Sequence, residues 1–544
     1  MRRFSAFAEG RKLLLLLLLV PIAALLVAHS LYFDFVSDDA YISFVYARNL
    51  AEHGELVFNL GDRVEGYTNF LWTVLLGVLL ELGVQPELSS RVIGTALGIA
   101  TLALTVGCSR LWWSGRTTSP VVVVVVDGTA SCVALSPWDY LPAMLLAISS
   151  GFACWCSGGL ETQLFTFLVI LGIHAYLADS LVFAGVALAL AALTRPEGCL
   201  VLAATVGHRV AVSLIREHRL LPRRQELLMI GAFCAIYLPF FAWRWWYYGW
   251  PFPNTFYVKV GGPQSPQYAR QVLANGAYYV WQWATQSRAL LAIPLAIVAF
   301  WRAPRVCSYL LLLSAAYLAY VANIGGDFMG LHRFVMPLFV TTALLSTLGL
   351  RQLAGWWLSR SSARPWSAVV PAAAACLLLG AFAWSQARLS KKSLVPVADR
   401  GIDRPGYLKL YAHDRELIGR ALAPRLRPDD FSIVGGAGVQ PYVARMRAID
   451  VFGLVSETIA HEVPPTNPRP GHQKWAPASL LLRYSPTFVF HCYDIHRSPS
   501  SYRLCGEART FEENGYEPVT IHVPGLRERG EYYTFLKRRD RDWQ

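Results

Sequence analysis

Two adjacent acidic residues, Asp38 and Asp39, directly follow the first long apolar stretch of the sequence. From Ala40 onward, apolar side chains recur at helical spacing, which predicts an amphipathic helix that lies on a bilayer surface. One aspartate suffices to cap such a helix, and two carboxylates beside lipid carry an electrostatic cost. We therefore expect at least one of the pair to act as a general base, with helix capping as the alternative.

More hydrogen-bonding side chains stand where the next apolar stretch begins: Glu65, Tyr67 and Asn69. Glu65 and Asn69 are one helical turn apart, so both can face a single ligand, for which we expect a sugar. Tyrosine is also common at membrane–water boundaries, so Tyr67 is assigned to substrate binding only together with its neighbours.

Two tight turns between later apolar stretches carry charged groups. Glu161 follows two glycines at a predicted helix start, where capping is the simpler role. Arg195 and Glu197 flank a proline, and they either pair with each other or contact a ligand. Glu161 and Glu197 are thus candidate substrate-binding residues, and Arg195 is a candidate ligand of a phosphate.

Residues 247–262 form an aromatic segment, broken by prolines, that contains Asn254 and a single lysine, Lys259. Stacking on a sugar or contact with a prenyl chain fits this composition, and so does an aromatic belt at the membrane boundary. We expect Asn254 to contact substrate and Lys259 to contact a phosphate.

Residues 323–333 combine a glycine-rich turn with Asp327, His332 and Arg333. Basic groups at the membrane boundary are what a lipid phosphate needs, and snorkelling of the basic side chain is the alternative. His332 and Arg333 are therefore candidate phosphate ligands, and Asp327 is a candidate substrate ligand.

The composition identifies the kind of protein that must position these groups. Of 544 residues, 54% are hydrophobic and only 16% are charged, against about a quarter charged in soluble proteins. This excludes a soluble cytosolic enzyme, a disordered chain and a fibrous one. The net charge of +13 comes without a dense basic block, so the positive-inside rule explains it better than a nucleic-acid partner.

Apolar stretches long enough to approach a bilayer's thickness predict a multi-pass helical membrane protein with about 11–13 spans. We place thirteen of them near residues 13–33, 68–83, 91–108, 119–137, 139–157, 160–178, 181–193, 198–214, 226–247, 289–301, 306–323, 333–350 and 367–386. The first can also be read as a signal peptide. Basic loops predict a cytoplasmic N-terminus, which puts the loops with the polar clusters and the segment 387–544 outside.

Residues 1–386 are therefore predicted to form a transmembrane catalytic module whose first outer loop is 34–67. Residues 387–544 hold 24 basic and 18 acidic residues, which predicts a separate soluble domain. Strand-like runs near 431–434 and 487–490 favour an α/β fold. The glycines at 435–438 are interpreted as a structural turn because they lack the P-loop register. Cys492 and Cys505 are either free or joined in a disulfide.

The polar clusters together resemble the GT-C superfamily of polytopic glycosyltransferases that use lipid-phosphate sugars, including bacterial cell-wall arabinofuranosyltransferases and mannosyltransferase-type enzymes. The matching segments follow one order along the chain: 38–42, 48–50, 57–65, 159–161, 194–198, 253–259 and 325–329, with a tail motif at 448–454. Ala40 stands where the arabinofuranosyltransferases have glycine, so the resemblance does not extend to the identity of the sugar. It adds Arg48 to the candidate substrate-binding residues.

The resemblance implies a polyprenyl-phosphate sugar donor, a glycan, lipid or protein acceptor, and an outer-facing site in a bacterial inner membrane. An aspartate would deprotonate the acceptor hydroxyl, which displaces the lipid phosphate with inversion, and the superfamily favours the first acid, Asp38. No cofactor is demanded, although Asp38, Asp39 and Asp327 can offer oxygen ligands to a divalent metal ion. The rival hypotheses are a transporter or flippase of lipid-linked sugars and a non-catalytic envelope-assembly protein.

Overall fold

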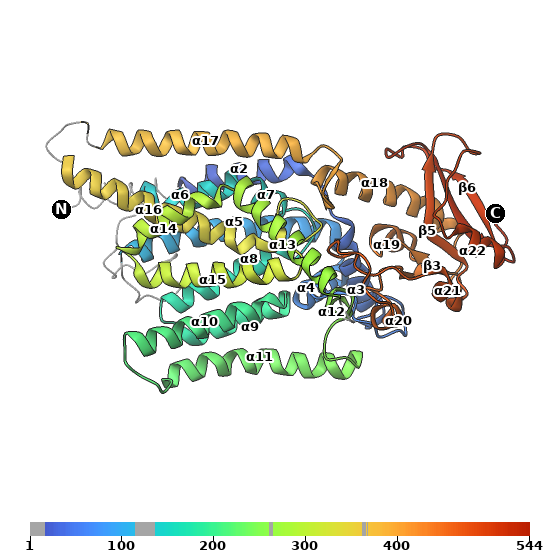
Figure 1. Ribbon diagram of the computed structural model, residues 1–544, viewed down its shortest axis with the longest axis horizontal. Coiled ribbons are helices and arrows are strands. Elements are labelled where there is room, and N and C mark those ends of the chain that lie inside the picture. Colours follow the sequence, from blue (N-terminus) through green and yellow to red (C-terminus); the bar gives the residue numbers. More distant parts are fainter. Residues whose placement is uncertain (1–16, 115–135, 261–264, 362–365, 367, 544) are drawn as a thin grey trace.

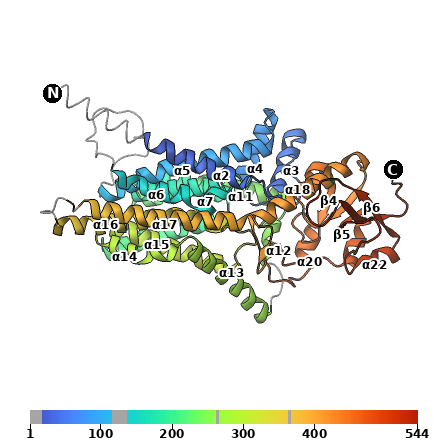
Figure 2. The ribbon, with the colours of Figure 1, turned by 90° about the horizontal axis from the view of Figure 1, so that it is seen from above.

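A computed structural model describes residues 17–114, 136–260, 265–361, 366 and 368–543. It consists of a long helical bundle with a smaller domain, formed by the C-terminal part of the chain, at one end (Figure 1). The view turned by 90° shows the same division (Figure 2). The expected span at 119–137 and the start of the first expected span fall mostly outside the described residues.

Six helical segments of the described chain are long and apolar enough to cross a membrane. They are α5 (Pro86–Ser114), α10 (Glu197–Ile215), α11 (Arg224–Tyr248), α15 (Pro304–Asn323), Arg333–Ser361, which contains α16 (Met336–Ser361), and α17 (Val369–Ser393). The number is up to eight if each of two bent helix pairs counts as one span. These pairs are α2 (Leu19–Phe33) with α3 (Asp38–His53), and α13 (Pro266–Gln286) with the helical segment Ala289–Phe300, which contains α14 (Ala292–Phe300). The chain is therefore a multi-pass membrane protein, as predicted.

Several predicted spans are helices that are too short to cross alone. These are α4 (Phe70–Glu81), α8 (Thr162–Leu177) and α9 (Leu181–Thr194), and the stretch at 139–157 divides into α6 (Pro137–Ile148) and α7 (Ser150–Cys154). Helix α8 is buried on nearly every side, which explains why its sequence is apolar all round. In contrast, α17 runs along the outside of the bundle (Figure 1).

Helix α3 differs from the expected surface helix. It turns by 98° from the direction of α2, and residues 40–49 are all buried. Its apolar side chains Ile42 and Val45 belong to a core cluster that includes Val434 and Ala437 of the C-terminal domain. The apolar stripe that suggested contact with lipid is thus covered by protein, and α3 lies between the two parts of the molecule.

The C-terminal domain is built on a five-stranded mixed sheet in the order β4-β3-β5-β7-β6. Its strands are β3 (Phe431–Val434), β4 (Arg447–Asp450), β5 (Phe488–His496), β6 (Tyr516–His522) and β7 (Tyr532–Arg538). Strand β3 pairs in parallel with β4 and β5, whereas β7 runs antiparallel to both of its neighbours. The helices are α18 (Pro405–Leu422), α19 (Val439–Ala444), α20 (Glu457–Glu462), α21 (Ala478–Leu481) and α22 (Ala508–Glu513). The predicted α/β class is confirmed.

The connection between the two parts is a continuous helix, because α17 extends to Ser393, a few residues past the predicted boundary at 387. The short strands β1 (Ala398–Asp399) and β2 (Ile402–Asp403) follow it and pair with each other. In the domain itself, Cys492 and Cys505 form a disulfide.

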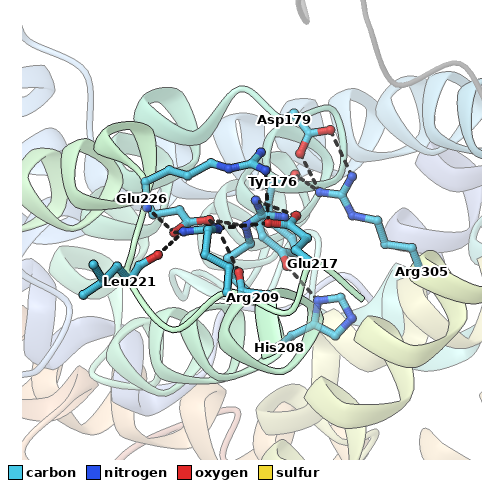
Figure 3. A network of polar contacts seen from close by, with 11 residues as sticks. Tyr176, Asp179, His208, Arg209, Glu217, Leu221, Glu226 and Arg305 are labelled. Atoms are coloured by element: carbon cyan, nitrogen blue, oxygen red, sulfur yellow. Dashed lines mark hydrogen bonds and ion pairs between the residues drawn. The ribbon is translucent and has the colours of Figure 1, made fainter. Parts of the chain in front are cut away.

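At the far end of the bundle, a polar network joins the ends of several helices (Figure 3). Arg209 of α10 contacts Glu226 of α11 at 2.6 Å, and Arg305 of α15 contacts Asp179 at 2.6 Å. Three of the arginines around the loop 209–225, which set the predicted orientation, thus pair with carboxylates: Arg209, Arg219 and Arg223. This network fixes the helix ends that lie opposite the C-terminal domain.

Candidate active site

A cavity of about 360 Å³ lies where the helical bundle meets the C-terminal domain. Nine of the fourteen site residues predicted from the sequence line it: Asp38, Asp39, Tyr67, Asn69, Glu161, Arg195, Lys259, Asp327 and Arg333. They come from segments scattered over some 300 residues of sequence. The fold therefore brings most of the separate polar clusters into one space.

The paired aspartates occupy the first turn of α3, but neither is its cap. Ser37 holds the N-cap position, with extended backbone angles. Asp38 Oδ1 instead accepts a 2.8 Å hydrogen bond from the backbone N–H of Val439 in the C-terminal domain. Asp39 points toward the bundle, with its Oδ2 3.6 Å from Arg333. The two carboxylates thus face different walls of the cavity.

Burial makes Asp38 a weaker acid than an exposed aspartate. Loss of solvent raises the pKa of this carboxyl to about 6; the Val439 N–H opposes the rise and the charge of Asp39 adds to it. Burial also raises the pKa of Asp39, and the nearby Arg333 guanidinium opposes that rise. A carboxylate whose pKa lies near the working pH is well suited to accept a proton from a hydroxyl group.

Three cations from separate elements surround one aromatic ring, that of Phe334. The charged groups of Arg195, Lys259 and Arg333 lie 4.7, 5.6 and 5.3 Å from the ring centroid. Cations within about 6 Å of a ring face are attracted by its quadrupole, so Phe334 helps to hold three like charges together. We call these three side chains the cation cluster. Phe334 itself was not predicted, because a phenylalanine beside a basic residue carries no distinctive pattern.

Carboxylates keep the cation cluster ordered. Arg195 contacts Glu161 at 2.8 Å and Glu197 at 2.9 Å, and Arg333 contacts Asp327 at 2.6 Å. The Glu161 carboxylate also accepts a hydrogen bond from Asn69. Such buried networks hold their members in one arrangement because breaking a pair leaves an uncompensated charge. Glu161 and Glu197 therefore orient Arg195.

The other five predicted residues lie outside the cavity lining. Arg48 donates a 2.7 Å hydrogen bond to the carbonyl of Tyr442, and His332 hydrogen-bonds Gln286 at 3.1 Å. Glu197 stands behind Arg195. These three side chains support the parts of the fold that form the cavity walls.

Asn254 and Glu65 also lie behind the cavity. The Asn254 amide donates to the carbonyl oxygens of Gly453 and Ser456, so it fastens the outer loop to the C-terminal domain. Glu65 is buried 3.7 Å from Arg244, and burial raises its pKa to about 8. The sequence pattern located these two residues near the site without distinguishing their structural contacts from contacts to substrate.

The C-terminal domain contributes a whole wall that the sequence did not predict. Asp403 lines the cavity and pairs with Arg469 at 2.8 Å, and burial raises its pKa to about 6. Aromatic side chains cover the same wall: Tyr407, Tyr411, Phe452, Trp475 and Tyr493. The aromatic and histidine residues of 472–493 could have indicated a binding surface, but nothing in the sequence showed that this segment folds back over the bundle.

The glycine turn that follows β3 closes the cavity against Asp38. A side chain at Gly436 would place its first carbon 2.9 Å from Asp38 Oδ2, and one at Gly438 would overlap the Asp38 carbonyl oxygen. Glycine is required here because the two backbones approach so closely. The turn thus packs directly against the candidate base.

The carboxylates proposed for a divalent metal do not form a ligand set. Asp38 faces the Val439 N–H, whereas Asp39 and Asp327 both face Arg333. Within the described ranges, no group of three His, Cys, Asp or Glu side chains is arranged to hold a metal ion.

The fold resembles two crystal structures of ArnT from Cupriavidus metallidurans. The structure bound to undecaprenyl phosphate has a TM-score of 0.56 and 14% identity over 96% of this chain and 97% of that chain. The apo structure has a TM-score of 0.53 and 12% identity over 96% and 98%. No protein-family model and no curated protein matches the sequence. The likeness shows the fold, which this chain shares with ArnT over almost its whole length.

Proposed function

We propose that this protein is a membrane glycosyltransferase that moves a sugar from a polyprenyl-phosphate donor to an acceptor in the bacterial envelope. The observation that carries the proposal is a single cavity that holds a cation cluster beside two buried aspartates. Cations suit a phosphate leaving group, and a carboxylate of raised pKa suits an acceptor hydroxyl. Undecaprenyl phosphate is bound in the ArnT structure of similar fold, which supports a lipid donor.

The lipid phosphate would bind at the cation cluster. Negative charge grows on the phosphate as its bond to the sugar breaks, and the positive charges of Arg195, Lys259 and Arg333 would stabilise it. Both arginines are held by carboxylates, and burial lowers the pKa of the third cation, Lys259. A bound phosphate would give Lys259 an anionic partner.

Asp38 is the proposed base. Its carboxylate faces the C-terminal wall, away from the phosphate, and accepts the proton of the acceptor hydroxyl as the oxygen attacks the anomeric carbon from the face opposite the phosphate. This attack inverts the configuration at that carbon. Asp39, 3.6 Å from Arg333, is the second candidate base and would in any case orient that guanidinium.

The cellular arrangement follows from the charge pattern. The basic end of the bundle would face the cytoplasm of a bacterial inner membrane, and the cavity and the C-terminal domain would face outward. The acceptor is then a glycan, lipid or protein of the envelope.

Binding of undecaprenyl phosphate to the purified protein in nanodiscs tests the proposal. We expect Lys259→Met to raise the dissociation constant at least tenfold, because a charged hydrogen bond is worth about 1.5–3 kcal/mol. The matched control is Lys391→Met at the exposed end of α17, which should bind as the wild type does. Equal binding by wild type and Lys259→Met would refute a phosphate site at the cation cluster.

A further inference from the structure

One part of the C-terminal wall has features of a ligand site that the transfer chemistry does not use. Trp475 keeps 42% of its surface exposed although it lines the cavity. Its ring lies edge-on to Phe452 at 5.6 Å and to His491 at 5.9 Å between centroids. These two contacts fix the orientation of a broad aromatic surface that faces open space.

Polar atoms without partners surround this aromatic surface. Both ring nitrogens of His491 and the side-chain oxygen of Gln473 are buried and have no hydrogen-bond partner among the residues that the structure describes. His491 is only 6% exposed, and burial lowers its pKa to about 3, so the imidazole is neutral. Buried polar groups are normally paired, and an unpaired one costs about 1–3 kcal/mol. A ligand that pairs with these atoms would recover that cost.

The loop that carries Trp475 is already ordered. The backbone carbonyl of Gln473 accepts hydrogen bonds from the N–H groups of Thr466 and Asn467, and Ala476 donates to the carbonyl of Val451. A fixed loop loses little entropy when a ligand binds. Arg469, the arginine of this domain that lines the cavity, is already paired with Asp403.

We propose that Trp475, His491 and Gln473 form the subsite that binds a neutral sugar unit of the acceptor. This inference rests on the proposed function and identifies the acceptor, at its reactive end, as a glycan. A sugar ring presents an apolar C–H face to Trp475 and hydroxyl groups that both donate and accept, which a neutral imidazole and an amide can satisfy. An acyl chain would leave the polar atoms unpaired, at a cost in affinity.

The position of this subsite suits the reaction. The Trp475 wall and the turn that contacts Asp38 belong to the same domain, and Gly435 of that turn lies beside His491. A sugar held on Trp475 would thus present its hydroxyl groups on the Asp38 side of the cavity. The cation cluster, on the bundle side, would remain free for the donor phosphate.

Saturation-transfer NMR with the full-length protein in phosphatidylglycerol–phosphatidylethanolamine nanodiscs tests the subsite. The probes are the methyl glycosides of arabinose, galactose, glucose, mannose and N-acetylglucosamine. We expect at least one to receive saturation at its ring protons, with at least a fivefold loss in Trp475→Ala and retention in Trp475→Phe. His491→Phe, which keeps the ring but removes the nitrogens, should also lose binding.

The matched control is Tyr502→Ala, which removes another exposed aromatic side chain of the same domain outside the cavity lining. It should bind the glycosides as the wild type does. The inference is overturned if no glycoside receives saturation, if Trp475→Ala retains the signal, or if a short envelope peptide competes where glycosides do not. Binding of undecaprenyl phosphate to the wild type is measured in the same nanodiscs. Failure of the wild type to bind this lipid would instead count against the proposed function.

Discussion

Replacing Gly438 by alanine should separate the C-terminal domain from the candidate base. The added methyl group would lie 2.6 Å from Asp38 Oδ2 and would overlap the Asp38 carbonyl oxygen, and neither atom can move without disturbing the start of α3. The turn must therefore retreat, and the 2.8 Å hydrogen bond from the Val439 N–H to Asp38 is lost.

The size of the effect follows from that bond. A hydrogen bond to a charged group is worth about 1.5–3 kcal/mol, so transfer should fall roughly tenfold to a hundredfold. The Val439 N–H stabilises the carboxylate, so its loss raises the pKa of Asp38. A base acts only when deprotonated. The wild-type rate should therefore fall below about pH 6, and in Gly438→Ala this fall should begin about one to two pH units higher.

The assay is incorporation of labelled sugar into envelope glycan by isolated membranes across a pH series. Gly506→Ala is the control, because a side-chain carbon at this exposed glycine of the same domain meets no atom of the described residues within 4 Å. It should keep the wild-type rate and pH profile. An unchanged pH profile in Gly438→Ala, at equal protein level, would refute the role of the turn in setting the acidity of Asp38.

Two further outcomes are expected. Asp327→Asn leaves the buried Arg333 without its 2.6 Å partner, so it should destabilise the protein by about 3–5 kcal/mol and weaken the binding of undecaprenyl phosphate. An unchanged thermal unfolding curve would contradict this prediction. Cys492→Ser with Cys505→Ser removes a cross-link that spans 13 residues and should cost about 2–4 kcal/mol of stability in the C-terminal domain. Thermal unfolding with and without reductant measures this loss of stability. Unfolding of the wild type that does not change with reductant would contradict a disulfide between these cysteines.

The sequence predicted the membrane module and much of its site because charged groups are rare there. Against an apolar background, Asp39, Arg195 and Arg333 stand out, and the cost of burying them limits them to functional or paired positions. The same pattern could not distinguish a side chain that lines the cavity from one behind it. In sequence, Glu197 fits pairing with Arg195 as well as contact with a ligand, and His332 looks like a ligand. The fold shows that they contact Arg195 and Gln286.

The C-terminal wall was not predictable for a different reason. Polar and aromatic residues are common in a soluble domain, so Asp403 and Trp475 do not stand out from the neighbouring residues of the sequence. Their role depends on long-range contacts, such as the backbone hydrogen bonds that join Asp403 to Phe328 and to Gly330. Helix α3 was misplaced on the bilayer because an apolar stripe does not show whether lipid or protein covers it.

The most direct test of the central claim compares envelope glycans from strains that differ only in this protein. The strains carry the wild type, a deletion, the double variant Asp38→Asn with Asp39→Asn, and the control pair Asp540→Asn with Asp542→Asn, two exposed acids far from the cavity lining. At matched protein levels, we predict that the deletion and the cavity variant lose the same sugar residue while the control retains it. Retention of that sugar by the cavity variant would contradict catalysis by the paired aspartates.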